Sequence, residues 1–161
     1  MSDFVEEIER FFASFSPEEI RVSRHAFQAV LDGEPAKLSD LPTALGLDRA
    51  VVTSAADRLV EKGVMVVEPE TGRIVGVRGL SVAETDHRLS LAGRQFYAFC
   101  AVDAVGIPAA LRADARVESR CHHCRAPLVV ELRGGVIAES PEGMVIWAVE
   151  RDLTRSLRAY T

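Results

Sequence analysis

The chain has 161 residues, of which 48% are hydrophobic and 27% are charged. A chain of this length forms one ordinary domain or two small ones and buries roughly two thirds of its unfolded surface. The composition excludes disorder, collagen and coiled coil as descriptions of the whole chain. No apolar run approaches the roughly 20 residues of a membrane span, and the acidic N-terminus lacks the features of a secretory signal. We therefore expect a cytoplasmic protein with no membrane partner.

The net charge of −5 is unevenly distributed along the chain. Residues 1–80 hold 9 Lys or Arg against 14 Asp or Glu, whereas residues 81–161 hold 10 of each kind. Proteins that bind nucleic acids usually present a basic face, which the first half lacks. The sequence also has 3 cysteines, an odd number in a chain without an export signal. Metal binding or thiol chemistry explains them better than a disulfide framework.

The first half of the chain predicts a series of helices followed by a β-hairpin. Ser16, Pro17 and Glu19 have the types and spacing of a capping box, so a helix should begin at Pro17. This order of elements is typical of a winged helix-turn-helix unit, which we expect over residues 37–79. The expected helices cover residues 1–15, 17–31, 39–45 and 49–62, and the hairpin strands cover residues 64–67 and 73–77.

The expected recognition helix of that unit carries no excess of positive charge. Three basic residues are matched by three acidic ones, and the wing carries Glu68 and Glu70 where many wings carry Arg or Lys. A helix that follows DNA phosphates is normally basic, so DNA binding is disfavoured and the unit is expected to serve as a scaffold. The charged residues of this helix are Asp48, Arg49, Asp57, Arg58, Glu61 and Lys62.

The second half predicts one long helix and a small sheet. Residues 92–110 are strongly apolar, and we expect a helix there that bends or ends at Pro108. Short runs separated by Gly and Pro predict a mostly antiparallel sheet, followed by a helix over residues 150–160. The fold class is therefore α+β, with a winged-helix-like helical unit over residues 1–80 and a long helix and small sheet over residues 81–161. The expected strands cover residues 115–119, 127–133, 136–139 and 144–149.

Cys100 and Asp103 are the first candidates for chemistry. They lie three residues apart in the expected long helix, so their side chains share one face. Their neighbours are apolar, and a carboxyl group buried among them could hold a proton near neutral pH. A thiol beside such an acid can bind a soft metal and protonate an atom attached to that metal. The plainer alternative is a small core cysteine and an aspartate that bonds a backbone amide.

Cys121 and Cys124 close a C-x-x-C turn with two histidines between them. Such a turn presents two thiolates to one metal ion, and His122 could add an imidazole. A structural zinc site needs four ligands, so the remaining one would come from Cys100, His87, His25, water or a partner chain. If the turn packs beside Cys100, the soft ligands and Asp103 converge in a way that suits Hg(II), an organomercurial, As(III), Cu(I) or Zn(II). The alternative is a solvated turn with two free thiols.

Several segments resemble the alkylmercury lyase (organomercurial lyase) family. The stretch RQFYAFCAVD, followed by Ile107-Pro108-Ala109, is similar to the core motif of that family. Upstream, DGEPAKLSDLPTALGLDRAVV resembles the family's winged-helix-like N-terminal region. The resemblance extends over residues 26–147 and identifies residues 81–161 as a truncated lyase-like domain. Its further matching segments are residues 115–121, 126–128 and 141–144.

Members of this family break a carbon–mercury bond by protonolysis. The resemblance implies an enzyme in which the Cys100 thiolate takes the organomercurial and Asp103 passes a proton to its carbon. The products are a hydrocarbon and Hg(II), which leaves on external thiols, and no cofactor is required for the chemistry. The family's second catalytic cysteine has no counterpart after Met144, so the chain resembles a shortened member. Cys121 or Cys124 would then supply the second thiolate.

Two other functions remain open on the sequence alone. One is a non-catalytic protein that binds a soft metal, such as Hg, Zn, Cu or As, through Cys100, Cys121, Cys124 and His122. The other is a winged-helix transcription regulator that responds to such a metal. The first requires metal in the purified protein, and the second requires binding to DNA.

Overall fold

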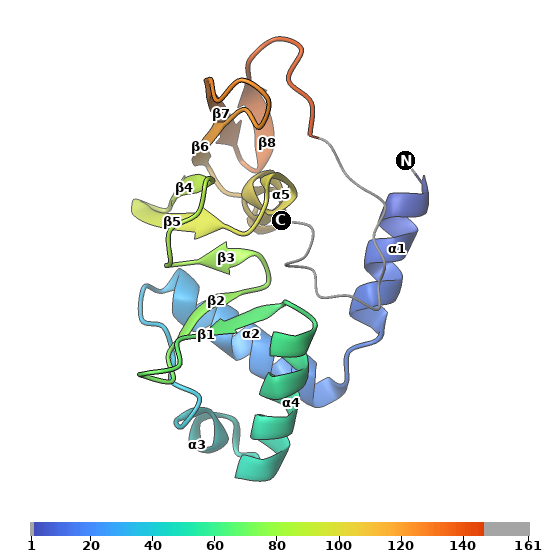
Figure 1. Ribbon diagram of the computed structural model, residues 1–161, viewed down its shortest axis with the longest axis vertical. Coiled ribbons are helices and arrows are strands. Elements are labelled where there is room, and N and C mark those ends of the chain that lie inside the picture. Colours follow the sequence, from blue (N-terminus) through green and yellow to red (C-terminus); the bar gives the residue numbers. More distant parts are fainter. Residues whose placement is uncertain (1, 147–161) are drawn as a thin grey trace. The chain divides into compact units, whose positions relative to one another are not determined.

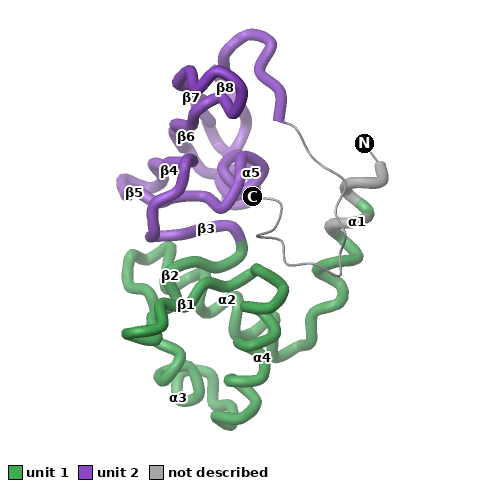
Figure 2. Tube along the Cα trace, viewed as in Figure 1, with its two compact units in different colours: residues 1–78, 148–161 green, residues 79–147 purple. Residues whose placement is uncertain are grey.

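The computed structural model describes residues 2–146, which form two compact units (Figures 1 and 2). The division falls between Arg78 and Gly79. We call the part up to Arg78 the helical unit and the part from Gly79 onward the sheet unit. In the part of the chain that is described, no helix combines the length and the apolar character needed to cross a membrane. The α+β fold class predicted from the sequence is confirmed.

The described part of the helical unit contains helices and one hairpin. These are α1 (Ser2–Ala13), α2 (Pro17–Leu31), α3 (Leu41–Leu45), α4 (Arg49–Glu61), β1 (Met65–Val67) and β2 (Ile74–Val77). The capping box predicted for α2 is present, because Ser16 Oγ accepts from the Glu19 amide at 3.2 Å and the Glu19 carboxylate accepts from the Ser16 amide at 2.6 Å. The elements follow the expected order, and the winged helix-turn-helix assignment stays a prediction.

Glu19 ties α2 to the C-terminal end of α4. Its side chain is only 2% exposed, and its Oε1 accepts from Lys62 Nζ at 3.0 Å and from Arg58 Nε at 3.2 Å. Burial alone raises the pKa of this carboxyl group, but the bond from the Ser16 amide and the two cations outweigh burial, and its pKa is lowered. Arg58 and Lys62 are therefore engaged inside the unit, which supports the expectation that this helix does not follow a phosphate backbone.

The sheet unit is an antiparallel sheet with a helix packed against it (Figure 1). Its described elements are β3 (Leu80–Ser81), β4 (Arg88–Leu91), β5 (Arg94–Ala98), α5 (Ala101–Leu111), β6 (Ala115–Arg120), β7 (Pro127–Arg133) and β8 (Val136–Glu139). The strand order is β3-β5-β4-β6-β7-β8, with antiparallel neighbours throughout. Helix α5 contacts β4, β5, β6 and β7. The core lies on this face, where one row of buried residues crosses the four strands: Phe96, Leu89, Val117 and Val130.

The expected long helix over residues 92–110 is wrong in its first half. Ala92 and Gly93 have φ angles of 51° and 75°, which turn the chain back on itself after β4. The residues that follow pair with β4 as strand β5, and their burial alternates so that Phe96 and Ala98 face the core. A short apolar run fits a buried strand as well as a helix, and here the left-handed turn decides between them. The helix begins only at Ala101 and continues through Pro108 to Leu111.

The later elements agree with the sequence in part. Strands β6, β7 and β8 lie where the sequence predicts them. The strand expected over residues 144–149 is not present in its described part, since Met144 to Ile146 lie outside any strand. The rest of that strand and the helix expected over residues 150–160 lie outside the described residues.

Candidate active site

Cys100 lies at the junction between β5 and α5, where it is the N-cap of the helix. Its backbone is extended, with φ −149° and ψ 174°, and its sulfur accepts a hydrogen bond from the Asp103 amide at 3.5 Å. Cysteine is an uncommon N-cap, since Ser, Thr, Asp and Asn are preferred there. The capping position places the sulfur at the positive end of the α5 dipole, where a thiolate or an anion is stabilised.

The Cys100 thiol and the Asp103 carboxyl group are in direct contact. The Cys100 Sγ donates to Asp103 Oδ2 at 3.0 Å, and both residues are half-buried. Burial, followed by the negative charge of Asp103 and this hydrogen bond, raises the pKa of the Cys100 thiol to about 11. The thiol is therefore protonated at neutral pH, and its proton points at the carboxylate. An electrophile that takes the sulfur can release this proton to Asp103.

Gly79 packs directly against the Asp103 carboxyl group. A Cβ atom built on Gly79 would lie 2.4 Å from Asp103 Oδ1 and 2.5 Å from its Cγ, distances that real Cβ atoms essentially never show. The glycine also has a φ of +87°, and its carbonyl oxygen accepts from the Phe99 amide at 2.8 Å. The absence of a side chain here is therefore what leaves room for the carboxyl group beside Cys100. Sequence reasoning missed this residue, because the contact joins positions far apart in the chain.

His87 is a residue that the sequence offered only as a possible fourth metal ligand, and the structure places it half-buried. It directly precedes β4 and follows the alternation that places Leu89 and Leu91 on the face covered by α5. The half-buried ring has its Nδ1 2.9 Å from Ser119 Oγ. Burial lowers the pKa of His87, while the charges of Asp86 and Asp103 act in the opposite direction. The alternating pattern of residues 87–91 is the sequence signal that could have placed this histidine near the site.

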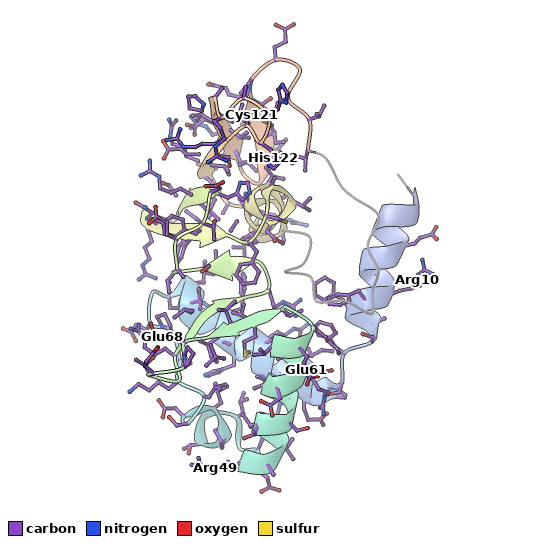
Figure 3. All side chains as sticks on the ribbon, viewed as in Figure 1. Arg10, Arg49, Glu61, Glu68, Cys121 and His122 are labelled. Atoms are coloured by element: carbon purple, nitrogen blue, oxygen red, sulfur yellow. The ribbon has the colours of Figure 1, made fainter. Side chains whose placement is uncertain are left out.

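The Cys121–Cys124 turn joins β6 to β7, and Figure 3 labels Cys121 and His122 of this turn. It is closed by hydrogen bonds from the Cys121 amide to the Ala126 carbonyl at 2.8 Å and from the Arg125 amide to the Cys121 carbonyl at 2.9 Å. The backbone amides of Cys124 and His123, followed by the Cys124 thiol, hydrogen-bond to the Cys121 sulfur and lower its pKa. His122, His123 and Cys124 are exposed.

The structure does not bring this turn and Cys100 into one ligand group. Strands β5 and β6 both pair with β4, in register at Arg88, so one strand separates Cys100 from Cys121. With strands about 4.8 Å apart, the two cysteines follow strand ends roughly 10 Å from each other. Among residues 2–146 no three His, Cys, Asp or Glu side chains are grouped closely enough to hold a metal ion. The convergence of three soft ligands, which the sequence left open, is therefore not present among the described residues.

The α+β fold, together with the contact between the Cys100 thiol and the Asp103 carboxyl group, defines the class of protein. It is a protein with a cysteine–aspartate site at the N-terminus of a helix. The alkylmercury lyase family model matches residues 80–161. The crystal structure of the mercury-bound form of MerB2 is 30% identical, with a TM-score of 0.87, and the match covers 94% of this chain and 73% of that one. The chain therefore belongs to the alkylmercury lyase family, and the resemblance drawn from the sequence is confirmed.

Three curated relatives show how far the similarity extends. The alkylmercury lyase of Bacillus cereus is 29% identical over 136 residues, which are 84% of this chain and 60% of that protein. The alkylmercury lyase of Pseudomonas putida is 34% identical over 98 residues, or 61% of this chain and 44% of that protein. The chain thus spans about 60% of the length of its Bacillus cereus relative, and 60% of that from Clostridium butyricum.

Proposed function

We propose that this protein cleaves the carbon–mercury bond of organomercurials by protonolysis, with Cys100 as the thiol that binds mercury and Asp103 as the group that carries the proton. The observation that supports this most directly is the 3.0 Å hydrogen bond from Cys100 Sγ to Asp103 Oδ2. It places one proton between a soft ligand for mercury and a carboxylate, which are the two groups that the reaction needs.

The first step transfers mercury to the protein. The substrate is an organomercurial carried by an external thiol, R–Hg–SR′. A bond forms between Cys100 Sγ and mercury, the bond between mercury and the external sulfur breaks, and R′S⁻ is released. The thiol proton passes to Asp103 Oδ2, the atom that already accepts it in a hydrogen bond. The raised pKa of Cys100 keeps this proton in place until mercury arrives.

The second step breaks the carbon–mercury bond. The external thiolate R′S⁻ returns to mercury as a second sulfur ligand, and two thiolates increase the electron density on the carbon. The carbon leaves with the bonding pair and takes the proton from Asp103 as R–H. The products are a hydrocarbon and Hg(II) held between Cys100 and the external thiolate, and Asp103 is again a carboxylate. We assign the second thiolate to an external thiol because one strand separates Cys121 from Cys100.

This proposal is tested by the release of benzene from phenylmercury in an excess of a low-mass thiol, measured by gas chromatography. We expect turnover by the wild type, none above background for Cys100→Ala, and a loss of roughly 10²- to 10⁴-fold for Asp103→Asn. Asp57→Asn is the matched control, since Asp57 is exposed on α4 in the helical unit. Thermal unfolding of each variant separates loss of chemistry from loss of fold. No benzene from the wild type, or equal release from Cys100→Ala, rejects the proposal.

A further inference from the structure

We infer that Cys121 and Cys124 form a second site, separate from Cys100, that holds Hg(II) between two thiolates. Both cysteines belong to one turn, which is closed by the backbone hydrogen bonds from Cys121 to Ala126 and from Arg125 to Cys121. A closed C-x-x-C turn holds its two thiols within reach of one cation, and residues 122–124 of this turn are exposed.

The number of ligands selects the kind of cation. In the described residues, no third His, Cys, Asp or Glu side chain joins the two thiols. A structural zinc ion requires four ligands, so this turn does not satisfy it. Hg(II) is soft, and two thiolates in a linear arrangement satisfy it. A thiophilic two-coordinate cation is thus the ligand class that the turn fits.

The position of the turn suits a site that receives the product of Cys100. Both cysteines follow strands that run in the same direction, β5 and β6, and leave the sheet at the same edge. Their strand ends lie two strand spacings, roughly 10 Å, apart, and in the described residues no group of three His, Cys, Asp or Glu side chains joins them into one metal site. Hg(II) would therefore move between them as a complex with an external thiol.

Hg(II) is transferred to the turn by thiol exchange, which requires no further reactant. Hg(II) arrives bound to two low-mass thiolates. Two bonds from mercury to external sulfur break, bonds to the Cys121 and Cys124 sulfurs form, and the two protein thiol protons leave with the external thiolates. The inference rests on the proposed function only for the source of the ion, since binding itself requires no cleavage.

The test uses the full chain, reduced and dialysed against HgCl₂ in an excess of a monothiol, with retained mercury measured by elemental analysis. A monothiol competes poorly with a chelate, because the second bond to the protein forms within one molecule. We expect about one Hg(II) per chain in the wild type and in Cys100→Ser, and at least about tenfold less in Cys121→Ser and in Cys124→Ser. Zinc under the same conditions should not be retained.

Three outcomes would overturn the inference. Equal retention by the Cys121→Ser variant would show that the turn does not hold mercury. Loss of retention in Cys100→Ser would show that the sites are not separate, and retained zinc would show additional ligands. Benzene release by the wild type, measured on the same preparation, keeps the two proposals distinguishable. Retention without cleavage leaves the dithiol site in place and rejects only the proposed function.

Discussion

The sheet unit holds two thiol sites that follow parallel strand ends but keep sulfur in different states. At Cys100 the sulfur is half-buried, bonded to a carboxylate, and carries a thiol whose pKa is raised to about 11. At Cys121 the sulfur accepts from backbone amides and from a second thiol, and its pKa is lowered. The difference arises from the neighbours, because a carboxylate opposes a second negative charge and amide donors stabilise it.

This contrast gives the two sites different chemical uses. A thiol that keeps its proton beside an acid is suited to a reaction that must deliver a proton, since the acid can take that proton and pass it on. A thiol that ionises readily next to a second thiol is suited to capturing a soft cation from solution. The same residue type thus serves cleavage in one place and capture in the other, under the two proposals made above.

The largest effect that would test this comparison is in thiol reactivity. At pH 7 the thiolate fraction of Cys100 should be about 10⁻⁴, whereas that of Cys121 should exceed that of an ordinary cysteine, because its pKa is lowered. A thiolate of low pKa is also a weaker nucleophile, and this reduces the rate advantage of Cys121 roughly tenfold. We therefore expect iodoacetamide to modify Cys121 about 10- to 100-fold faster than Cys100, as measured by mass spectrometry of the peptides.

The pH dependence of alkylation shows whether the pKa of each cysteine is raised or lowered. The Cys100 rate should rise about tenfold per pH unit up to roughly pH 11, whereas the Cys121 rate should level off at a lower pH than that of an ordinary cysteine. Denatured protein, in which both cysteines have ordinary pKa values, is the control. Equal rates in the folded protein, or a Cys100 profile that levels off below pH 9, would contradict the comparison.

A smaller effect is expected from filling the space beside Asp103. Gly79→Ala places a Cβ against the carboxyl group, whereas Gly93→Ala adds the same methyl group where nothing lies within 4 Å. Both glycines have positive φ angles, so the backbone cost of alanine is common to the two variants. We expect Gly79→Ala to lose about 1–3 kcal/mol more stability than Gly93→Ala in urea unfolding, because of overpacking.

Gly79→Ala and Gly93→Ala also test what sets the pKa of the Cys100 thiol. If Gly79 makes room for the carboxyl group, Gly79→Ala moves Asp103 away from Cys100 and shifts the alkylation profile of Cys100 to lower pH, while Gly93→Ala leaves it in place. Equal stability and equal profiles in the two variants would show that Gly79 does not position Asp103.

The features that could be predicted from the sequence are those that depend on residues close together in the chain. The start of α2 could be predicted, since Ser16 and Glu19 contact each other across one turn. Strand β5 could not, because an apolar run such as FYAF fits a helix or a buried strand, and the turn at Gly93 decides. Cys100 and Asp103 were found through their spacing and the family resemblance. Gly79 was not, since its partner comes from a distant part of the chain.

A still smaller effect is expected when the charge of Asp103 is removed. Its negative charge and its hydrogen bond to the thiol both raise the pKa of Cys100, although burial is the larger cause. In Asp103→Asn the thiol pKa should therefore fall, and alkylation of Cys100 at pH 8 should become several-fold, up to about tenfold, faster. Asp57→Asn serves as the control. A slower reaction in Asp103→Asn would mean that the carboxylate activates the thiol instead of holding its proton.

The smallest effect should come from the ion pair beside the dithiol turn. Arg125 Nη1 lies 3.2 Å from Asp86 Oδ2, and both side chains are more than half exposed. Exposed pairs contribute about 0–1 kcal/mol, so Arg125→Ala should change the free energy of unfolding by less than about 1 kcal/mol. The positive φ of Arg125 costs alanine no more than arginine. The Cys121 profile should also stay in place, because the amides of His123 and Cys124 lower its pKa. A shift of that profile toward ordinary cysteine in Arg125→Ala would mean that the ion pair, and not the backbone of the turn, sets the state of this thiol.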